Sequence, residues 1–359
     1  MLSQVGSSQV GSRVACFTSL TCRYLPRARV LAQTLRAAHP DWHLCAVLVD
    51  APPPGIDLAL PLATFDAVVD PRMLGLPGFA AWMFGHDVVE ACTAVKGAML
   101  LRLLDAGWDR VVYLDPDIAV FHGLHEIVAR LDAASVVLTP HQTTPNATST
   151  AIGDNEGASL RLGVFNLGFL AVGNDAVGWQ FARWWAGMLA AACYDEPEHG
   201  LFVDQKYCDL VPGLFDRVHV ERDPGANVAS WNISQRRIAI TEAGDILARG
   251  SPLKFFHFSK CGGDGEAMTE RYAGSNFEVF ELWSWYRRQL AANAVAGLPS
   301  GWWHYGRFAD GATVPMAARR LYRGRDDLIA AFGDPFASGP GSLQEWLAHE
   351  APQVFDAAL

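Results

Sequence analysis

The sequence has few basic residues and lacks a long apolar segment. It contains 28 Lys and Arg against 38 Asp and Glu, which gives a formal net charge of -10 at pH 7. Nucleic acids and anionic membrane surfaces are bound by clustered basic residues, so this balance argues against either as the main partner. A membrane-spanning helix needs about 18 or more consecutive apolar residues, and the sequence has no such run. We therefore expect a small-molecule substrate and no membrane span.

Cysteine pairs are lacking as well. The seven cysteines are odd in number and scattered, and none of them forms a CxxC pair that would indicate zinc or a redox centre. They predict reduced thiols in a cytoplasmic protein, located either in the cytoplasm at large or at the inner face of the membrane. The polar opening segment, residues 1–12, has neither the basic start nor the apolar core of a secretion signal, and it predicts a disordered leader.

The remaining sequence is that of a globular α/β protein. Its 359 residues are 50% hydrophobic, enough for one large core. Strand-like segments at residues 14–18 and 44–49 alternate with helix-like segments at 24–39 and 88–105. Such alternation is typical of α/β folds with a largely parallel sheet.

The segment 111–120 contains two carboxylates one residue apart at the end of an apolar strand. Asp115 and Asp117 should emerge at the carboxyl edge of the sheet, where open α/β sheets place their ligands. Hard oxygen donors suit Mg²⁺ or Mn²⁺, and these ions keep positions open for the phosphate oxygens of a nucleotide. The alternative is a strand that ends in an Asp-Pro turn with solvated carboxylates.

Later segments supply further candidates for the same site. Asn166 and Gly168 lie near the start of another apolar strand, and Asp204 and Gln205 follow a short apolar stretch. A glycine in a strand can allow a ligand to approach the backbone. His257 lies in an alternating apolar strand before a glycine-rich turn. Its imidazole could complete the shell of a metal, or it could be a satisfied core histidine.

The segment 141–160 is polar and rich in Thr, Asn and Gly. It predicts a mobile loop just after the carboxylate pair. A loop in this place is a candidate lid or acceptor loop, although long polar loops are often surface connections only.

The C-terminal part carries no catalytic motif but is rich in aromatic residues. These could stack on acceptor sugars or pack a helical cap over the main domain. Residues 317–331 have the pattern of an amphipathic helix that contains Arg319, Arg320, Arg323 and Arg325.

The order of the motifs resembles that of the nucleotide-sugar glycosyltransferases of the GT-A fold, most closely the family 8-like retaining group and a bacterial subgroup of it. The resemblance covers residues 13–265 and is carried by Ala15–Thr18, Lys96, Asp115-Pro-Asp117, Phe165–Gly168, Asp204–Gln205 and His257–Ser259. It implies a Rossmann-like, mixed and mostly parallel sheet flanked by helices. The catalytic domain would span 13–270, with a helical, aromatic-rich C-terminal region at 271–359 packed on it.

The resemblance also implies a role for each motif. Asp115, Asp117 and His257 would bind Mn²⁺ or Mg²⁺, and Asp204 and Gln205 would lie at the reaction centre. The donor nucleotide sugar would be held by Thr18, Leu20, Tyr24, Lys96, Asn166, Gly168 and Lys260, of which Lys260 stands where the family has a glycine.

The implied reaction moves a sugar from a nucleotide diphosphate sugar, with a UDP-sugar favoured, to an acceptor hydroxyl with retention of configuration. The acceptor could be a glycan, a lipid-linked molecule or a small molecule. An inverting relative would need a carboxylate base, and Asp223 or Asp264 could provide one.

Two other classes remain open on the sequence. A haloacid dehalogenase-type phosphatase also has two aspartates after an apolar strand, but Ala119 stands where such enzymes carry Thr or Val. A non-catalytic nucleotide-sugar binding protein would keep the same fold without turnover. Release of phosphate from sugar phosphates would favour the first, and binding without hydrolysis or transfer would favour the second.

Overall fold

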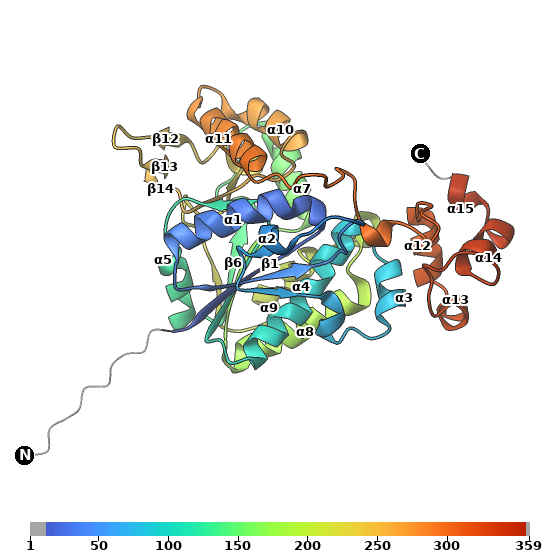
Figure 1. The fold of residues 1–359 in the computed structure, drawn as a ribbon. Coiled ribbons are helices and arrows are strands. Elements are labelled where there is room, and N and C mark those ends of the chain that lie inside the picture. The colour runs from blue at the N-terminus through green and yellow to red at the C-terminus, as the bar shows by residue number, and fades with distance from the viewer. Residues whose placement is uncertain (1–11, 357–359) are drawn as a thin grey trace, which may run out of the picture.

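The computed structural model describes residues 12–356, so the leader expected over 1–12 lies almost entirely outside the described residues. A seven-stranded sheet forms the centre of the molecule (Figure 1), in the order β10-β6-β7-β4-β1-β2-β3. Its strands are β1 (Val14–Leu20), β2 (His43–Leu48), β3 (Ala67–Val69), β4 (Arg110–Leu114), β6 (Val136–Pro140), β7 (Phe165–Gly173) and β10 (Val218–Val220). Only β7 runs antiparallel to its neighbours in this sheet. The predicted α/β class with a mixed, mostly parallel sheet is confirmed.

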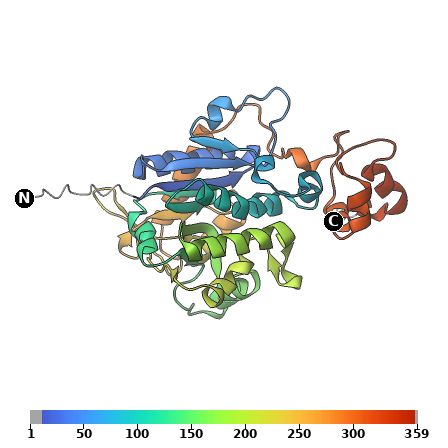
Figure 2. The same ribbon diagram turned by 90° about the horizontal axis from the view of Figure 1, so that it is seen from below.

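Helices cover both faces of this sheet, as Figure 2 shows from below. The core on one face includes α1 (Leu25–Ala38) and α5 (His125–Val128), and the core on the other includes α4 (Val88–Asp105) and α8 (Ala176–Ala192). Strand β4 serves both cores, because alternate side chains of a strand point to opposite faces. Val111 and Tyr113 face α4, whereas Val112 and Leu114 face α1. By the same alternation the next residue, Asp115, falls on the α4 side.

A smaller sheet lies beside the carboxyl end of β4. It has the order β11-β15-β5, with β5 (Ile118–Val120), β11 (Val228–Ala229) and β15 (Phe255–His257). Strand β15 pairs antiparallel with β5, and His257 is opposite Ile118. This register places the histidine next to the turn between β4 and β5. A hairpin-like sheet of β12 (Ile238–Ile240), β13 (Ile246–Ala248) and β14 (Ser251–Pro252), together with α10 (Asp264–Ala273) and α11 (Glu278–Ala292), flanks it.

The last helices form a separate lobe at one end of the molecule (Figure 1). These are α12 (Met316–Arg323), α13 (Asp326–Ala331), α14 (Leu343–Glu350) and α15 (Gln353–Asp356), which share a small core with Phe84 of α3 (Phe79–Phe84). The single helix expected over 317–331 is wrong: it breaks between Arg323 and Asp326. Gly324 lies at this break, and glycine has a low helix propensity. The expected domain boundary at 270 falls inside α10 and stays a prediction.

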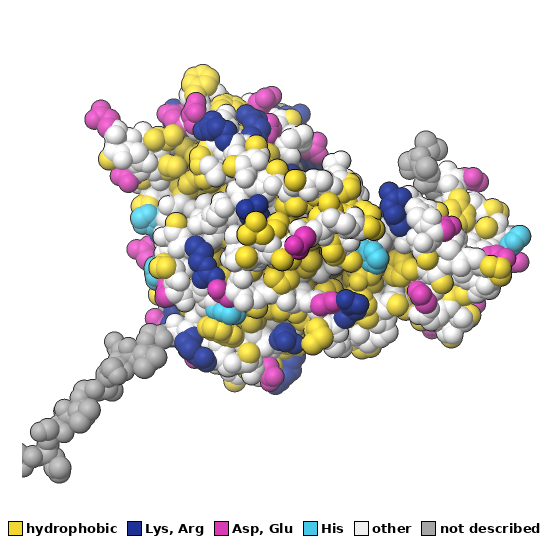
Figure 3. Space-filling model, in the orientation of Figure 1, with side chains coloured by type: hydrophobic (Ala, Val, Ile, Leu, Met, Phe, Trp, Pro, Cys, Tyr) yellow, Lys and Arg dark blue, Asp and Glu magenta, His cyan; other side chains and the backbone are white. Residues whose placement is uncertain are grey.

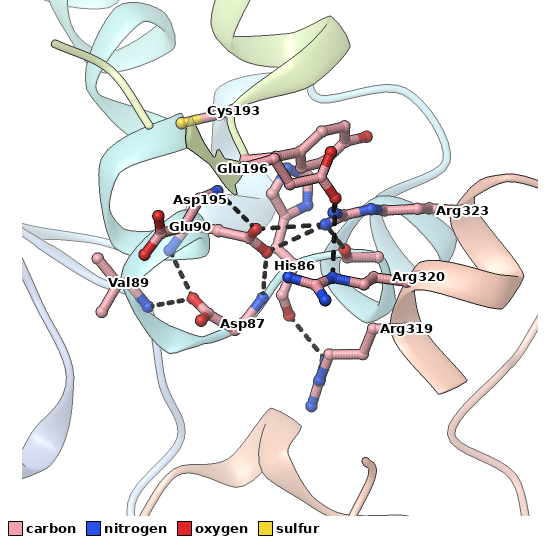
Figure 4. A network of polar contacts seen from close by, with 12 residues as sticks. His86, Asp87, Val89, Glu90, Cys193, Asp195, Glu196, Arg319, Arg320 and Arg323 are labelled. Atoms are coloured by element: carbon pink, nitrogen blue, oxygen red, sulfur yellow. Dashed lines mark hydrogen bonds and ion pairs between the residues drawn. The ribbon is translucent and has the colours of Figure 1, made fainter. Parts of the chain in front are cut away.

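Buried arginines join this lobe to the sheet domain (Figure 4). Arg319, 2% exposed, donates to the backbone carbonyls of Phe84 and His86 at 3.0 and 2.7 Å. Arg323 contacts both carboxylate oxygens of the fully buried Glu90, at 3.3 and 3.2 Å, and also pairs with Glu196. Glu90 in turn closes the capping box at the start of α4. The basic side chains of α12 therefore anchor the lobe to the helix that carries Lys96.

Several aromatic residues after position 276 pack inside the protein. Trp283 and Tyr286 are buried, and the Tyr286 ring stacks on Phe258 at a centroid distance of 4.0 Å. The indole groups of Trp302 and Trp303 donate to backbone carbonyls of Ala51 and Val49. Of the two sequence-based interpretations, these contacts favour packing over acceptor stacking.

The cysteines, the surface charge and the hydropathy of the helices each relate to an expectation from the sequence. All seven cysteines are free, and most are buried. Figure 3 shows Lys and Arg interspersed with Asp and Glu over one face of the molecule. Within residues 12–356, no helix has the length and apolar character that crossing a membrane requires.

The contact between α4 and α8 is closest at Gly97. A Cβ atom there would lie 2.5 Å from Cα of Ala186, a backbone atom that cannot move aside. We expect Gly97→Ala to lower the free energy of unfolding by about 1–3 kcal/mol through overpacking. The matched control is Gly187→Ala on α8, where a Cβ meets nothing within 4 Å and the better helix propensity of Ala should raise stability slightly. Urea unfolding of both variants checks this, and equal effects would contradict it.

Candidate functional site

Three side chains with metal-ligating atoms converge at the carboxyl edge of β4. One ligand atom each of Asp115, Asp117 and His257 lies within 4.8 Å of the others. Nε2 of His257 is 3.0 Å from Oδ1 of Asp117 and 3.6 Å from Oδ2 of Asp115. Burial alone would raise the pKa of Asp117, but His257 outweighs it and holds that pKa below its usual value. The structure thus brings together the three residues expected to bind a metal.

Two residues of β7, Asn166 and Gly168, fix the orientation of the His257 ring. Its Nδ1 lies 3.1 Å from Oδ1 of Asn166 and donates to it, so Nε2 is the nitrogen that faces the carboxylates and can become a ligand when it gives up its proton. Gly168 provides the space for the ring, since a Cβ there would lie 2.6 Å from Cε1 of His257. The backbone of Gly168 also accepts the amide hydrogen bond of Asp115 at 2.8 Å. Asn166 and Gly168 therefore support the metal-ligating groups directly.

Lys96 connects the metal-ligating turn to the segment that holds Asp204. Its Nζ is 2.7 Å from Oδ2 of Asp204, 3.3 Å from Oδ1 of Asp115 and 3.2 Å from the carbonyl of Leu167. The side chain is 2% exposed. Burial opposes its charge, but the carboxylates of Asp115 and Asp204 outweigh burial and hold the pKa of Lys96 well above its usual value. The three hydrogens of the ammonium group thus all have acceptors within the protein.

Asp204 and Gln205 lie in a tight, strained turn. The preceding residue, Val203, has φ of 39°, a region that β-branched residues rarely occupy. The carbonyl of Asp204 accepts from the indole of Trp185 at 3.2 Å, and Nε2 of Gln205 donates to the carbonyl of Leu162 at 3.0 Å. These bonds hold the strained turn against α8 and α7 (Gly157–Leu162).

A cavity of about 530 Å³ opens over this cluster. Its lining includes eleven of the twelve residues that the sequence nominated: Leu20, Tyr24, Lys96, Asp115, Asp117, Asn166, Gly168, Asp204, Gln205, His257 and Lys260. Thr18 is fully buried on β1 and does not line the cavity. The volume of the cavity is within the range of small-molecule binding sites.

The two candidate bases are placed differently. Asp264 lines the cavity but is exposed and pairs with Lys260 at 3.2 Å. Asp223 does not line the cavity, and its carboxylate faces the buried ammonium group of Lys254 at 3.8 Å.

The expected mobile loop at 141–160 is largely helical. It contains α6 (Ser149–Ala151), a π-helical turn (Ile152–Glu156) and the start of α7. Thr148 caps the first of these by accepting from the amide of Ala151, a role that its place in a polar run did not reveal. The segment still lies where it was expected, because it contributes His141, Asn155 and Ala158 to the cavity.

Three residues of the site were missed in the sequence. The Tyr113 hydroxyl donates to Oδ1 of Asp115 at 2.6 Å, and the two-residue period of a strand could have shown that these side chains share a face. Trp231 packs edge-on against His257 at a centroid distance of 5.3 Å. Nothing in the local sequence distinguishes Asn155 from the other polar residues of its segment.

Comparison with known proteins gave relatives of limited extent, and no family model matches the chain. The chain is 30% identical to YfnF of Bacillus subtilis (strain 168) over 177 residues, 48% of this chain and 57% of YfnF. It is 31% identical to YfnD of the same organism over 175 residues, 47% of this chain and 53% of YfnD. Both are described as uncharacterized proteins. The chain thus spans about half the length of the curated relatives it matches.

Several solved structures of glycosyltransferases are similar to the chain at low identity. The galactosyltransferase LgtC in complex with donor and acceptor sugar analogues is 18% identical, with a TM-score of 0.43 over 76% of this chain and 99% of LgtC. The bifunctional glycosyltransferase WbbM is 15% identical, with a TM-score of 0.46 over 82% of this chain and 51% of WbbM. Mouse xyloside xylosyltransferase 1 is 15% identical, with a TM-score of 0.42 over 71% of this chain and 100% of that protein.

Removal of Lys96 should destabilise the protein through the carboxylate that it leaves behind. Lys96→Met keeps the apolar stem but leaves Asp204 buried without its partner, which should cost about 3–5 kcal/mol of unfolding free energy. The double variant Lys96→Met/Asp204→Leu removes both charges and should recover much of this loss. Urea unfolding of both variants measures the difference, and a double variant no more stable than Lys96→Met would contradict the pairing.

Enlarging Gly168 should weaken metal binding without removing a ligand. The Cβ of Gly168→Ala would displace the imidazole of His257, while both carboxylates remain. We expect Mn²⁺ affinity, measured by titration calorimetry, to fall by about tenfold or more, the usual effect of disturbing a residue that orients a metal ligand. Gly213→Ala is the control, since a Cβ there meets nothing within 4 Å. Unchanged Mn²⁺ affinity in a folded Gly168→Ala protein would argue against the assigned ligand set.

Proposed function

We propose that this protein is a metal-dependent glycosyltransferase that moves a sugar from a nucleotide diphosphate sugar to an acceptor hydroxyl, with retention of configuration. The observation that carries the proposal is the cluster of Asp115, Asp117 and His257 on the wall of a cavity of about 530 Å³. The order of motifs in the sequence supports the same function. A UDP-sugar is the favoured donor.

The three side chains fit a hard divalent cation. They offer two carboxylates and one imidazole nitrogen, a donor set suited to Mn²⁺ or Mg²⁺. The hydrogen bond from His257 to Asn166 leaves Nε2 of the ring directed at the carboxylates. A cation bound there would act as a Lewis acid for the negative charge that develops on the leaving diphosphate.

The side chains around the three metal-binding residues have two roles, to orient Asp115 and to stabilise the reacting sugar. Tyr113 and Lys96 both bond Oδ1 of Asp115, which orients Oδ2 toward His257 and the ligand site. Lys96 also fixes the carboxylate of Asp204 beside the cavity. Glycosyl transfer passes through a state with positive charge on the sugar ring, which a nearby carboxylate or amide oxygen stabilises. We assign this role to Asp204 and Gln205.

Lys260 is a cation available to the diphosphate. Lys96 is buried and engaged, whereas the Lys260 side chain is 71% exposed at the rim of the cavity, where it pairs with Asp264. Its backbone has φ of 53°, the conformation that glycine adopts most readily, which fits a position where the similar family has glycine.

Retention is the stereochemical outcome that the carboxylates favour. An inverting enzyme needs a dedicated base, and Asp223 is turned toward Lys254 outside the cavity. Asp264 is open to solvent and its carboxylate is paired with Lys260 at 3.2 Å. The phosphatase alternative is not favoured either. One oxygen of Asp115, the nucleophile in that mechanism, is bonded by Tyr113 and Lys96.

Nucleotide binding tests the proposal directly. Calorimetric titration with UDP and GDP, with and without Mn²⁺, should show metal-dependent binding of one nucleotide. Asp117→Ala should weaken that binding by at least about tenfold, or 1.4 kcal/mol. Asp105→Ala, on the exposed end of α4 outside the cavity, should leave it unchanged.

The reaction itself is followed with sugar nucleotides of the nucleotide that binds. Slow metal-dependent release of the nucleoside diphosphate in the absence of acceptor, lost in Asp117→Ala, is the expected result. If neither nucleotide binds to the folded protein, the proposal fails. Release of inorganic phosphate from sugar phosphates would support the phosphatase instead.

A further inference from the structure

One polar side chain in the cavity has no partner in the protein. Asn155 is 3% exposed and lines the cavity, and neither Nδ2 nor Oδ1 makes a hydrogen bond within the described residues 12–356. A buried amide without partners costs free energy, and such groups are rare in folded proteins. Its lack of partners is therefore an observation that a ligand would explain.

The residues on either side of Asn155 make hydrogen bonds to other parts of the protein. Asp154 accepts from Arg271 at 2.5 Å and from the Tyr272 hydroxyl at 2.6 Å, which fastens it to α10. Glu156 accepts from the amide of Asn146 at 2.6 Å. These bonds fix the backbone of the turn on both sides of Asn155 and leave its side chain directed at the cavity.

The turn itself is unusual. Asn155 lies within the π-helical stretch Ile152–Glu156, a conformation that is rare and found often at functional sites. Among its neighbours along the cavity wall, Ala158 and Leu162 are apolar, and the hydroxyl of Ser159 donates to the backbone carbonyl of Asn155 at 2.8 Å and not to its side chain. A ligand in the cavity is thus the available source of both a donor and an acceptor.

The chemistry of the amide limits what that ligand can be. A carboxamide presents two N–H donors and one carbonyl acceptor. A phosphate would satisfy only the donors, and a cation only the acceptor. Hydroxyl groups both donate and accept, so a pair of neighbouring sugar hydroxyls satisfies both ends.

We propose that Asn155 is a specificity residue that binds sugar hydroxyl groups in this cavity. The indole N–H of Trp231, also on the cavity wall and without a partner in residues 12–356, is a second donor for the same ligand. The inference rests on the proposed glycosyl transfer. The hydroxyls belong to the transferred sugar of the donor or to an acceptor sugar, and the experiment separates the two sources.

The test compares Asn155→Leu, which has similar size and no polar atoms, with the wild-type protein. Titrations with Mn²⁺ use UDP or GDP, whichever binds, and its glucose, galactose, N-acetylglucosamine and mannose conjugates. If Asn155 binds the transferred sugar, the affinity of the variant for the best sugar nucleotide falls about tenfold, as expected for one or two lost hydrogen bonds. Its affinity for the free nucleoside diphosphate stays the same. If Asn155 binds an acceptor sugar, the affinity for the sugar nucleotide is unchanged and the KM for a methyl glycoside acceptor rises by a similar factor.

A stability measurement separates ligand binding from a structural role. Because Asn155 has no partners in the protein, Asn155→Leu should keep or raise the urea midpoint of the ligand-free protein. Thr150→Ala, an exposed change on the same segment outside the cavity, is the control for both measurements and should behave as wild type. A lower midpoint together with unchanged sugar affinity and KM would overturn the inference, as would a variant identical to wild type in all assays. Absence of any nucleotide binding by the wild-type protein would instead overturn the proposed function, and this inference with it.

Discussion

The buried ion pair between Lys96 and Asp204 is the interaction on which the site depends. It joins the middle of α4 to the strained turn after Val203, and through Asp115 it reaches the end of β4. A buried charge is tolerated only when it is paired and hydrogen-bonded, and Lys96 meets this condition with three acceptors. Displacing any one of these segments would leave a charge without its partner. The geometry of the site and the stability of the domain are therefore linked.

The direction of β7 completes the arrangement. Because β7 is antiparallel to β4, its first residues lie at the edge where β4 ends. Asn166 and Gly168 therefore contact His257, which lies on β15 of the separate small sheet. Segments that are distant in the sequence meet at one edge, each held by its own strand pairing.

The sequence predicts the chemistry of this edge better than its supporting contacts. Asp115, Asp117 and His257 are of residue types that bind metals, and the apolar pattern placed β1, β2, β4 and α4 correctly. The helical character of residues 149–162 was missed, because its polar composition hides the cap at Thr148 and the π-helical turn. Thr18 was assigned to the donor site through the family resemblance, yet its side chain on β1 is buried away from the cavity. Such outcomes depend on tertiary contacts that no local pattern records.

The charge that neutralises Glu90 comes from far along the chain. Arg323 lies 233 residues after Glu90, and the two meet at the start of the helix that carries Lys96. During synthesis on the ribosome, this acidic group must stay hydrated or protonated until the C-terminal lobe has emerged. The first turn of α4 consequently reaches its final electrostatic environment only after Arg323, 233 residues further along the chain, has been made and has folded back onto it.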